Sequence, residues 1–421
     1  MKYLPLALLL LACAEKPRPG ADASEFVYEP TCDNAEESVV IEGEVTWAAD
    51  VGAIVMEKCT GCHVEGGIAP FALDSYAAAS PMASAMAGAV LAKRMPPWPP
   101  SSCGDCQSFE HDRSLTDEQI ATIAAWADQG APEGGSAELE PRQLAALERE
   151  DAIVSWEGAD YTPSDAGSDS YRCFLVDAPS ATDAYFTAYE VRPGNPQVVH
   201  HVLIYHPNTE AAVADAEDLD ALDDELGYEC FGGAGVSSEP LVAWAPGGGA
   251  TVYPEGTGLP IAGGRPLILQ VHYNTGNGTG PDHTEVAITV EDDVETPAVL
   301  ARINNTELEL PPGQEAVTDS YEVPINQDIK VWGVLPHMHE LGQSIQLTAG
   351  AGSDETCMID IPDWNFHWQG MYLYTEPVTV TSGSTARITC VFDTTDRTET
   401  TVFGENTSDE MCLAFVYVTG A

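Results

Sequence analysis

The run Trp332-Gly-Val-Leu-Pro-His-Met-His-Glu-Leu-Gly342 places two histidines, His337 and His339, two positions apart. On an extended strand, residues two apart point to the same face, so both imidazoles can reach one metal ion. Histidine is scarce in this chain, with 10 in 421 residues, which makes the pair informative. The run therefore predicts a strand that carries part of a metal site.

A second pair, His200 and His201, lies in the β-rich run Val198-Val-His-His-Val-Leu-Ile-Tyr205. Adjacent residues on a regular strand face opposite ways, so both can bind one ion only where the strand bulges or ends. Taken alone, such a pair is more often one core and one surface histidine. The strand Leu267-Ile-Leu-Gln-Val-His272-Tyr-Asn274 favours a site, because it carries a histidine where an aliphatic residue would pack more readily.

Other candidate ligands are weaker. Met411 precedes the apolar run 413–418, and its thioether is a soft ligand that favours Cu(I), although a buried methionine is by default a core residue. His206 and His283 are expected on the surface or in loops, and His367 is expected to be structural.

From Tyr161 onward, short runs of Val, Ile, Tyr and Thr alternate with Gly, Pro, Asn and Asp turns. This texture is typical of an antiparallel β-sandwich or barrel. Roughly 260 residues remain, enough for two such modules. We expect these two antiparallel β-sandwich domains to span residues 161–298 and 299–421.

The motif Cys59-Thr-Gly-Cys62-His63 is the attachment signature of c-type haem. The two thiols add to the haem vinyl groups, and His63 is placed to bind the iron. The alternatives are a chance match or half of a zinc site. The only other C-x-x-C run is Cys103-Gly-Asp-Cys106, which lies far downstream in a Pro-rich loop. Haem c is therefore the favoured cofactor here.

The opposite iron ligand should be Met or His, and Met95 is our choice because flanking prolines would present its thioether on a rigid loop. Met82 and Met86 are rivals, but they lie in an Ala-rich run that favours a helix in which they pack.

A helix should follow, capped by Ser114 or Thr116 and ended by Gly130-Ala-Pro132. It resembles the C-terminal helix of a small cytochrome c. We expect a small all-α haem domain over 46–138 and a linker over 139–160.

The N-terminus indicates export. Lys2 precedes a short apolar run, 4–12, which is too short to span a bilayer. Its end, Leu-Leu-Ala-Cys13, resembles the bacterial lipobox, which implies cleavage before Cys13 and lipidation of its thiol, so 1–13 is a signal peptide. Because Ala14 is not Asp, we expect an outer-membrane anchor, on the periplasmic or surface face, followed by a flexible tether over 14–45. The alternative is an ordinary secretory signal with a chance cysteine.

The charge balance excludes some partners. The chain carries 16 Lys+Arg against 67 Asp+Glu, a formal net charge of −51. Nucleic acid is therefore excluded as an electrostatic partner, as are anionic lipid headgroups. An acidic, solvated surface is the simplest interpretation.

Eleven cysteines are present. If Cys13 takes lipid and Cys59 and Cys62 take haem, an even number remains for disulfides in an oxidising compartment. Their connectivity is open on these grounds. They are Cys32, Cys103, Cys106, Cys173, Cys230, Cys357, Cys390 and Cys412.

The two histidine strands, the His-x-His run and the Ser-Asp-Glu-Met-Cys run, taken together and in this order, resemble the copper type II, ascorbate-dependent monooxygenases. The resemblance covers about 161–421 and implies two jelly-roll-like β-sandwiches with a solvent cleft between two copper ions. It assigns an electron-storing copper to His200, His201 and His272, and an oxygen-binding, catalytic copper to His337, His339 and Met411. It also implies a Cys390–Cys412 disulfide and, more weakly, Cys173–Cys230.

Three positions depart from the peptide-hydroxylating members. Where those enzymes have a basic residue that holds the substrate carboxylate, this chain has Leu335. Where they have Asn and Tyr beside the substrate, it has Leu413 and Phe415. A carboxylate would meet an apolar wall, at a cost of several kcal/mol. The departures favour a neutral or apolar small-molecule substrate.

The sequence thus predicts a monooxygenase that hydroxylates a C–H bond with O₂. The fused haem would replace ascorbate as the donor to the first copper, and an external donor would reduce the haem. One alternative is a haem and copper lipoprotein that only carries electrons or sequesters copper. Another is a structural β-sandwich of the adhesion type.

Overall fold

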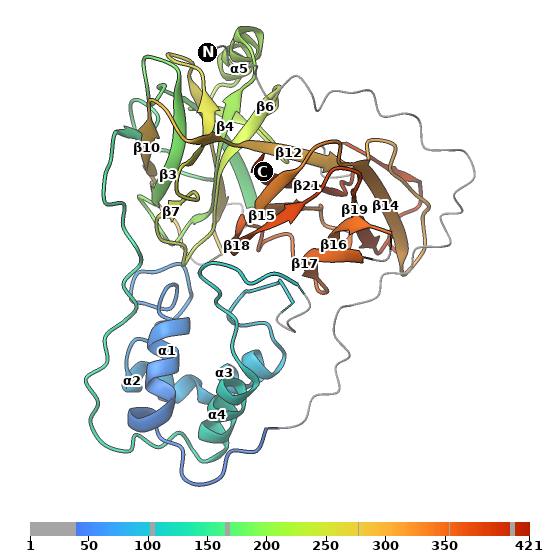
Figure 1. Cartoon of the computed structure of the whole chain (residues 1–421). Helices are drawn as coiled ribbons and strands as arrows, with labels where there is room; N and C mark the ends of the chain where they lie inside the picture. The colour runs from blue at the N-terminus through green and yellow to red at the C-terminus, as the bar shows by residue number, and fades with distance from the viewer. Residues whose placement is uncertain (1–38, 102–105, 165–168, 277, 353, 405–408) are drawn as a thin grey trace.

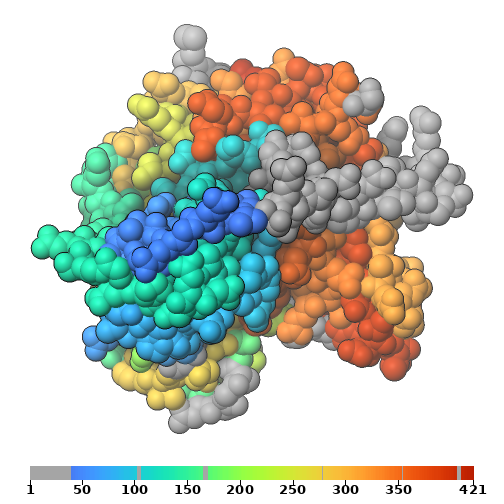
Figure 2. All heavy atoms as spheres, turned by 90° about the horizontal axis from the view of Figure 1, so that it is seen from below, coloured from blue at the N-terminus to red at the C-terminus, as the bar shows by residue number. Residues whose placement is uncertain are grey.

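The computed structural model describes residues 39–101, 106–164, 169–276, 278–352, 354–404 and 409–421. It is mainly β, with a small helical unit followed by two β units (Figure 1). Seen from below, the helical unit (blue to teal) lies in front of both β units (Figure 2). Cys13, with the predicted signal peptide and most of the predicted tether, lies outside the described residues. No described helix is long and apolar enough to cross a membrane.

The helical unit packs short helices around Val55, Ile123 and Trp126, all fully or almost fully buried. Its last helix has a complete capping box, because Thr116 accepts from the backbone of Gln119 and the Gln119 side chain accepts from Thr116 in return. Of the two predicted caps, Ser114 and Thr116, the cap is therefore Thr116. The elements are η3 (Trp47–Val51), α1 (Gly52–Lys58), α2 (Tyr76–Ala79), η4 (Ser80–Met82), α3 (Ala83–Leu91) and α4 (Asp117–Asp128).

The first β unit has two sheets, ordered β5-β2-β9-β4-β6 and β1-β10-β3-β8-β11, with β7 pairing β3. Their facing side chains form one core, and nearly every residue of the central strand β9 is buried. The strands are β1 (Ala152–Val154), β2 (Asp169–Val176), β3 (Ala184–Arg192), β4 (Val199–Pro207), β5 (Tyr228–Glu229), β6 (Ser238–Trp244), β7 (Thr251–Val252), β8 (Thr257–Ile261), β9 (Leu267–Asn274), β10 (Glu285–Glu291) and β11 (Thr296–Pro297).

A helix, α5 (Glu210–Leu222), interrupts this unit, although the sequence after Tyr161 predicts only strands and turns. Its Ala-rich composition has high helix propensity, so the sequence does carry a local signal for this helix. Thr209 caps it, and Ala216 packs beside the Cys173–Cys230 disulfide.

The second β unit pairs β12-β21-β15-β18 in one sheet and β14-β19-β16-β17 in the other, and a Cys390–Cys412 disulfide lies in the core between them. The strands are β12 (Val299–Asn304), β13 (Glu309–Leu310), β14 (Val317–Pro324), β15 (Ile329–His337), β16 (Gly342–Ala351), β17 (Asp354–Ile361), β18 (Tyr372–Val380), β19 (Thr385–Phe392), β20 (Thr401–Val402) and β21 (Leu413–Gly420).

A segment from the N-terminal half of the chain joins this second unit. Cys106 is bonded to Cys357, a pairing that the sequence left open. Beside it, the Glu110 amide donates to Leu373 at 2.8 Å, and the Thr375 amide donates to Ser108 at 3.0 Å. The segment lies in the range predicted as the haem domain, yet it extends the sheet at β18. The helical unit and the second β unit are thus tied covalently.

Candidate metal centre

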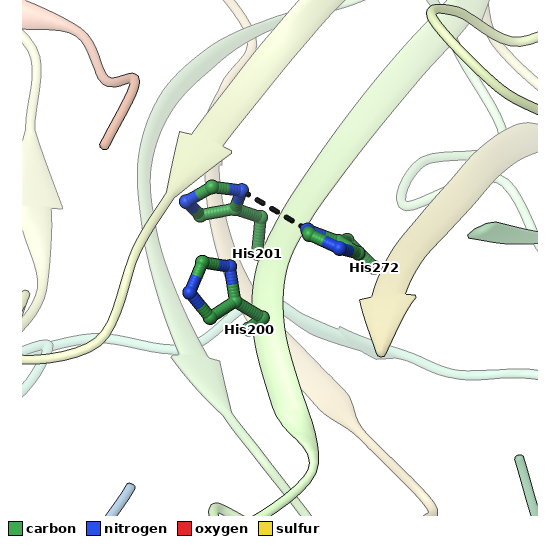
Figure 3. A group of neighbouring side chains, drawn as sticks. All are labelled: His200, His201 and His272. Carbon is green, nitrogen blue, oxygen red and sulfur yellow. Dashed lines mark hydrogen bonds between the residues drawn. The ribbon is translucent and has the colours of Figure 1, made fainter. Parts of the chain in front are cut away.

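His200, His201 and His272 converge, with one nitrogen of each lying within 4.8 Å of the others (Figure 3). His201 and His272 are directly opposite each other on the antiparallel strands β4 and β9. The register shifts between Val199 and His201, which marks a bulge. This irregularity is the condition that the sequence analysis set for two adjacent histidines to share one ion.

The spacing of the three rings suits one metal ion. Their centroids are 4.4, 4.9 and 5.3 Å apart. A nitrogen bonded at about 2 Å places its ring centre about 3 Å from the ion, so two rings on one tetrahedral ion lie about 5 Å apart. The triad therefore fits a copper ion without rearrangement of the strands.

Hydrogen bonds prepare one nitrogen of His272 for a metal. Its Nε2 lies 3.0 Å from Asp169 Oδ1, and a carboxylate only accepts, so Nε2–H donates and Nδ1 keeps its lone pair. That Nδ1 faces His201 Nδ1 at 3.3 Å, an approach that a shared cation would stabilise. The hydrogen bond from His272 in turn holds the pKa of Asp169 well below its usual range.

Burial keeps the triad uncharged. Desolvation lowers the pKa of His200 to about 3 and lowers the pKa of His201 and of His272 below the ordinary value. Neutral imidazole is the form that binds metals. Among the described residues, His200 Nδ1 is buried without a hydrogen-bond partner, as expected of an atom reserved for an ion.

The histidines of the second cluster, which consists of His337, His339 and Met411, are oriented in the same way. His337 Nδ1 lies 2.6 Å from Gln369 Oε1, and the Gln369 amide donates to the Phe366 carbonyl at 2.7 Å. The amide is therefore fixed, His337 Nδ1–H donates, and Nε2 keeps its lone pair, buried with no partner among the described residues. His339 Nδ1 donates to the Asp409 carbonyl at 3.1 Å, and the two rings are 5.2 Å apart.

Glu410 connects Met411, the third candidate ligand, to the segment that carries His337 and His339. Its fully buried carboxylate accepts from the amides of His339 at 2.8 Å, Leu341 at 2.9 Å and Met411 at 2.9 Å. It thereby holds the segment before β21 against the loop that follows β15. Burial outweighs these donors and raises the pKa of Glu410 to about 7.

One cavity of about 710 Å³ connects the two clusters. It is bordered by His201 and His272 from the first β unit and by His337 and Met411 from the second. The three apolar positions that depart from the peptide hydroxylases also line it: Leu335, Leu413 and Phe415. Arg302, on an exposed part of β12, is the one basic residue among the described lining residues.

The haem motif follows α1. Cys59 and Cys62 are unpaired, whereas the other described cysteines form disulfides. His63 Nδ1 donates to the Phe71 carbonyl at 3.0 Å, which leaves Nε2 for an iron ion. These features fit haem c. Met95 lies beyond α3 with 38% of its surface exposed, and its role as the opposite ligand stays a prediction.

Sequence reasoning misplaced one histidine. His206 was expected on the surface or in a loop, but it lies buried on β4 and accepts from the Ala262 amide at 3.2 Å. His367 was expected to be structural, which stays a prediction, and its ring centroid lies 5.6 Å from that of His200. Asp169, Gln369 and Glu410 were missed, because their roles depend on contacts between distant segments.

Two family descriptions match the β units: residues 159–279 match the copper type II ascorbate-dependent monooxygenase N-terminal domain, and residues 304–419 match the C-terminal domain. The chain belongs to this family of enzymes. The triad lies within the first range and the second cluster within the other. The family descriptions name copper, and the triad of His200, His201 and His272 fits a copper site.

Curated relatives are distant. The Xenopus laevis peptidyl-glycine alpha-amidating monooxygenase A is 27% identical over 266 residues, covering 61% of this chain and 26% of that protein. The human DBH-like monooxygenase protein 1 is 25% identical, covering 73% and 55%. The Caenorhabditis briggsae tyramine beta-hydroxylase is 24% identical, covering 65% and 49%. The chain therefore spans about half or less of the length of these relatives.

Replacing Gln369 by Leu should weaken one copper site of two. Loss of the acceptor frees the His337 ring, so copper affinity at that cluster should fall about 10–100-fold while the triad keeps its ion. Competition with a chelator, in a two-site titration, measures this. The matched control is Gln343→Leu on the exposed surface of the same unit. Equal affinities in both variants would contradict the orienting role.

Glu410 should make stability depend on pH. The pKa of Glu410 is about 7 in the folded chain and 4.5 in the unfolded chain, so the carboxyl stays protonated to a higher pH in the folded state. This contribution is complete below pH 4.5 and is lost as pH rises through 7. As pH rises from about 5 to about 8, the Tm of the metal-free wild type should therefore fall relative to the Tm of Glu410→Gln. The histidines titrate in both proteins, so their contributions cancel in the Tm difference. A Tm difference that is flat with pH would refute the assignment.

Proposed function

We propose that this protein is a copper-dependent monooxygenase that hydroxylates a C–H bond of a neutral or apolar small molecule with O₂. Two copper ions would serve it, and a fused c-type haem would supply electrons. The single observation that supports this best is the cavity bordered by both clusters, because a substrate in it would contact both candidate metal sites.

The two clusters suit different tasks. His200, His201 and His272 offer only imidazoles, which suits an ion that alternates between Cu(II) and Cu(I) and stores an electron. His337 and His339 are joined by the soft thioether of Met411, which favours Cu(I), the state that binds O₂. When bound, copper supplies oxygen activation. The chain orients the ligand nitrogens and encloses the substrate.

The cavity wall supports an apolar reacting group. Leu335, Leu413 and Phe415 would leave a substrate carboxylate unpaired, at a cost of several kcal/mol. A hydrophobic substrate would instead gain about 25 cal/mol for each Å² of apolar surface that it buries. The substrate class proposed is therefore neutral or apolar.

The haem motif lies against the first β unit. A Cβ built on Gly247 would lie 2.9 Å from Cys62 Sγ, and Arg113 donates to the Pro246 carbonyl at 3.1 Å. A cavity of about 120 Å³ at this junction is lined by residues of all three units, including Trp368, whose ring centroid is 5.7 Å from that of His200. These contacts support electron supply from haem c, bound through Cys59, Cys62, His63 and Met95, to the triad.

The cellular location of the protein is also a proposal. Disulfides at Cys106–Cys357, Cys173–Cys230 and Cys390–Cys412 support an oxidising compartment. We infer export and a lipid anchor on Cys13 at the outer membrane. Partners would then be the substrate, O₂ and an external reductant for the haem.

Turnover should require the sulfur of Met411. Met411→Leu keeps the side-chain volume but removes the soft ligand, so product formation and coupled O₂ uptake should fall by at least about 100-fold, since copper at this cluster would lose its Cu(I) preference. Gas chromatography of a panel of apolar substrates, with an oxygen electrode, measures both. Met358→Leu, at a buried methionine of the same unit, is the matched control.

Two results would count against this proposal. Turnover by Met411→Leu at the wild-type rate would remove the role of the thioether. A wild-type protein that binds copper and haem but shows no coupled O₂ uptake would instead be a redox or copper-handling protein.

Haem reoxidation should depend on the triad. The pyridine haemochrome spectrum should report one haem c per chain, lost in Cys59→Ser/Cys62→Ser. In copper-loaded protein, the reduced haem should reoxidise in a stopped-flow mixer when Cu(II) accepts its electron. His272→Ala should slow this step by at least about tenfold, because it removes a ligand of the acceptor ion. An unchanged rate would exclude the haem as the donor to this site.

A further inference from the structure

The loop between β17 and β18 brings side chains of the second β unit to the triad of the first. Its His367 ring centroid lies 5.6 Å from that of His200 and 6.3 Å from that of His272, with the His272 and His367 rings inclined by only 20°. The ring centroid of Trp368 also lies near, 5.7 Å from that of His200. The triad therefore faces a fourth imidazole that belongs to a different domain.

His367 Nδ1 is buried and has no hydrogen-bond partner among the described residues. Leaving a polar atom unpaired at such a position is destabilising, so it calls for a ligand that the protein atoms do not supply. The triad contains an atom in the same condition, His200 Nδ1, and the His200 and His367 ring centroids are 5.6 Å apart. Unsatisfied nitrogens from the two β units thus belong to neighbouring rings.

The backbone around His367 is held in position. The His367 amide donates to Asn365 Oδ1 at 2.9 Å, and the Trp368 amide donates to the Asn365 carbonyl at 2.9 Å. Two residues further on, Gln369 holds His337 at 2.6 Å. The same short loop therefore contacts the triad with His367 and the second cluster with Gln369, which restricts where the His367 ring can lie.

The distances permit coordination. With each ring centre about 3 Å from a shared ion, two ligand rings lie at most about 6 Å apart. The separation from His200 is within this limit, and that from His272 exceeds it by only a few tenths of an ångström.

We propose that His367 is a fourth ligand of the copper held by His200, His201 and His272, in its Cu(II) state. The inference rests on the proposed copper site. Cu(II) prefers four ligands in a tetragonal arrangement, whereas Cu(I) is stable with two or three. The bond from His367 to copper would therefore form on oxidation and break on reduction. The oxidised ion then joins the two β units across the cavity, and addition of one electron releases the link.

Copper K-edge absorption and EPR test this directly, because both report the ligands and neither depends on turnover. The second cluster is first emptied by His339→Ala, and the protein is loaded with one equivalent of Cu(II). The absorption fit should give four histidines, and His367→Asn should reduce this to three with a changed copper hyperfine splitting. Cu(II) affinity should fall by at least about tenfold, and Cu(I) affinity should change less.

Two further samples keep the test decisive. His283→Asn, which removes a partly exposed histidine beside Trp156, is the matched control and should leave the spectra unchanged. In His367→Ala, millimolar free imidazole should restore the four-nitrogen spectrum, which a folding defect would not allow. Three histidines in both parent and His367→Asn would overturn this inference but leave the copper site intact. No copper bound in either protein would overturn the proposed function itself.

Discussion

The metal chemistry of this protein depends on one irregularity in a strand. Without the shift between Val199 and His201, the imidazoles of His200 and His201 would lie on opposite faces of β4, and no ion could be shared. A bulge costs ladder hydrogen bonds, and the buried imidazole nitrogens that it gathers are left unpaired. The fold tolerates both costs because β4 lies between β9 and β6, and its pairing with both strands runs on from Val202. Stability lost locally is thus offset by the surrounding sheet.

Each cluster is oriented by acceptors from elsewhere in the chain. Asp169 lies on β2, Gln369 lies in the loop before β18, and the Asp409 carbonyl precedes β21. All three act in the same way, since each accepts from one imidazole nitrogen and leaves the other with its lone pair. The acceptors are a carboxylate, an amide and a carbonyl, which indicates that geometry rather than charge is the common requirement.

The parts that short-range patterns determine could be predicted. The His-x-His run and the Leu-Gln-Val-His strand each place histidines within a few residues, so the sequence indicated both histidine clusters and the mainly β fold around them. Haem c at the C-x-x-C-H motif stays a prediction. Contacts between distant segments could not be predicted in this way. The Cys106–Cys357 bond spans 251 residues, and no local signal relates them. His367 likewise meets the triad only because two domains pack together.

The walls of the shared cavity limit how substrate is recognised. Arg302, Phe415 and Leu335 lie opposite one another on β12, β21 and β15, so they form one row across the sheet. Neighbouring strands are about 4.8 Å apart, which puts the backbone of Arg302 about 10 Å from that of Leu335. An anionic group on a substrate could therefore meet Arg302 only if a long apolar body separated it from the metal ligands. Elsewhere the chain, with a net charge of −51, repels anions. Selection at the reacting carbon then depends on shape and hydrophobic contact.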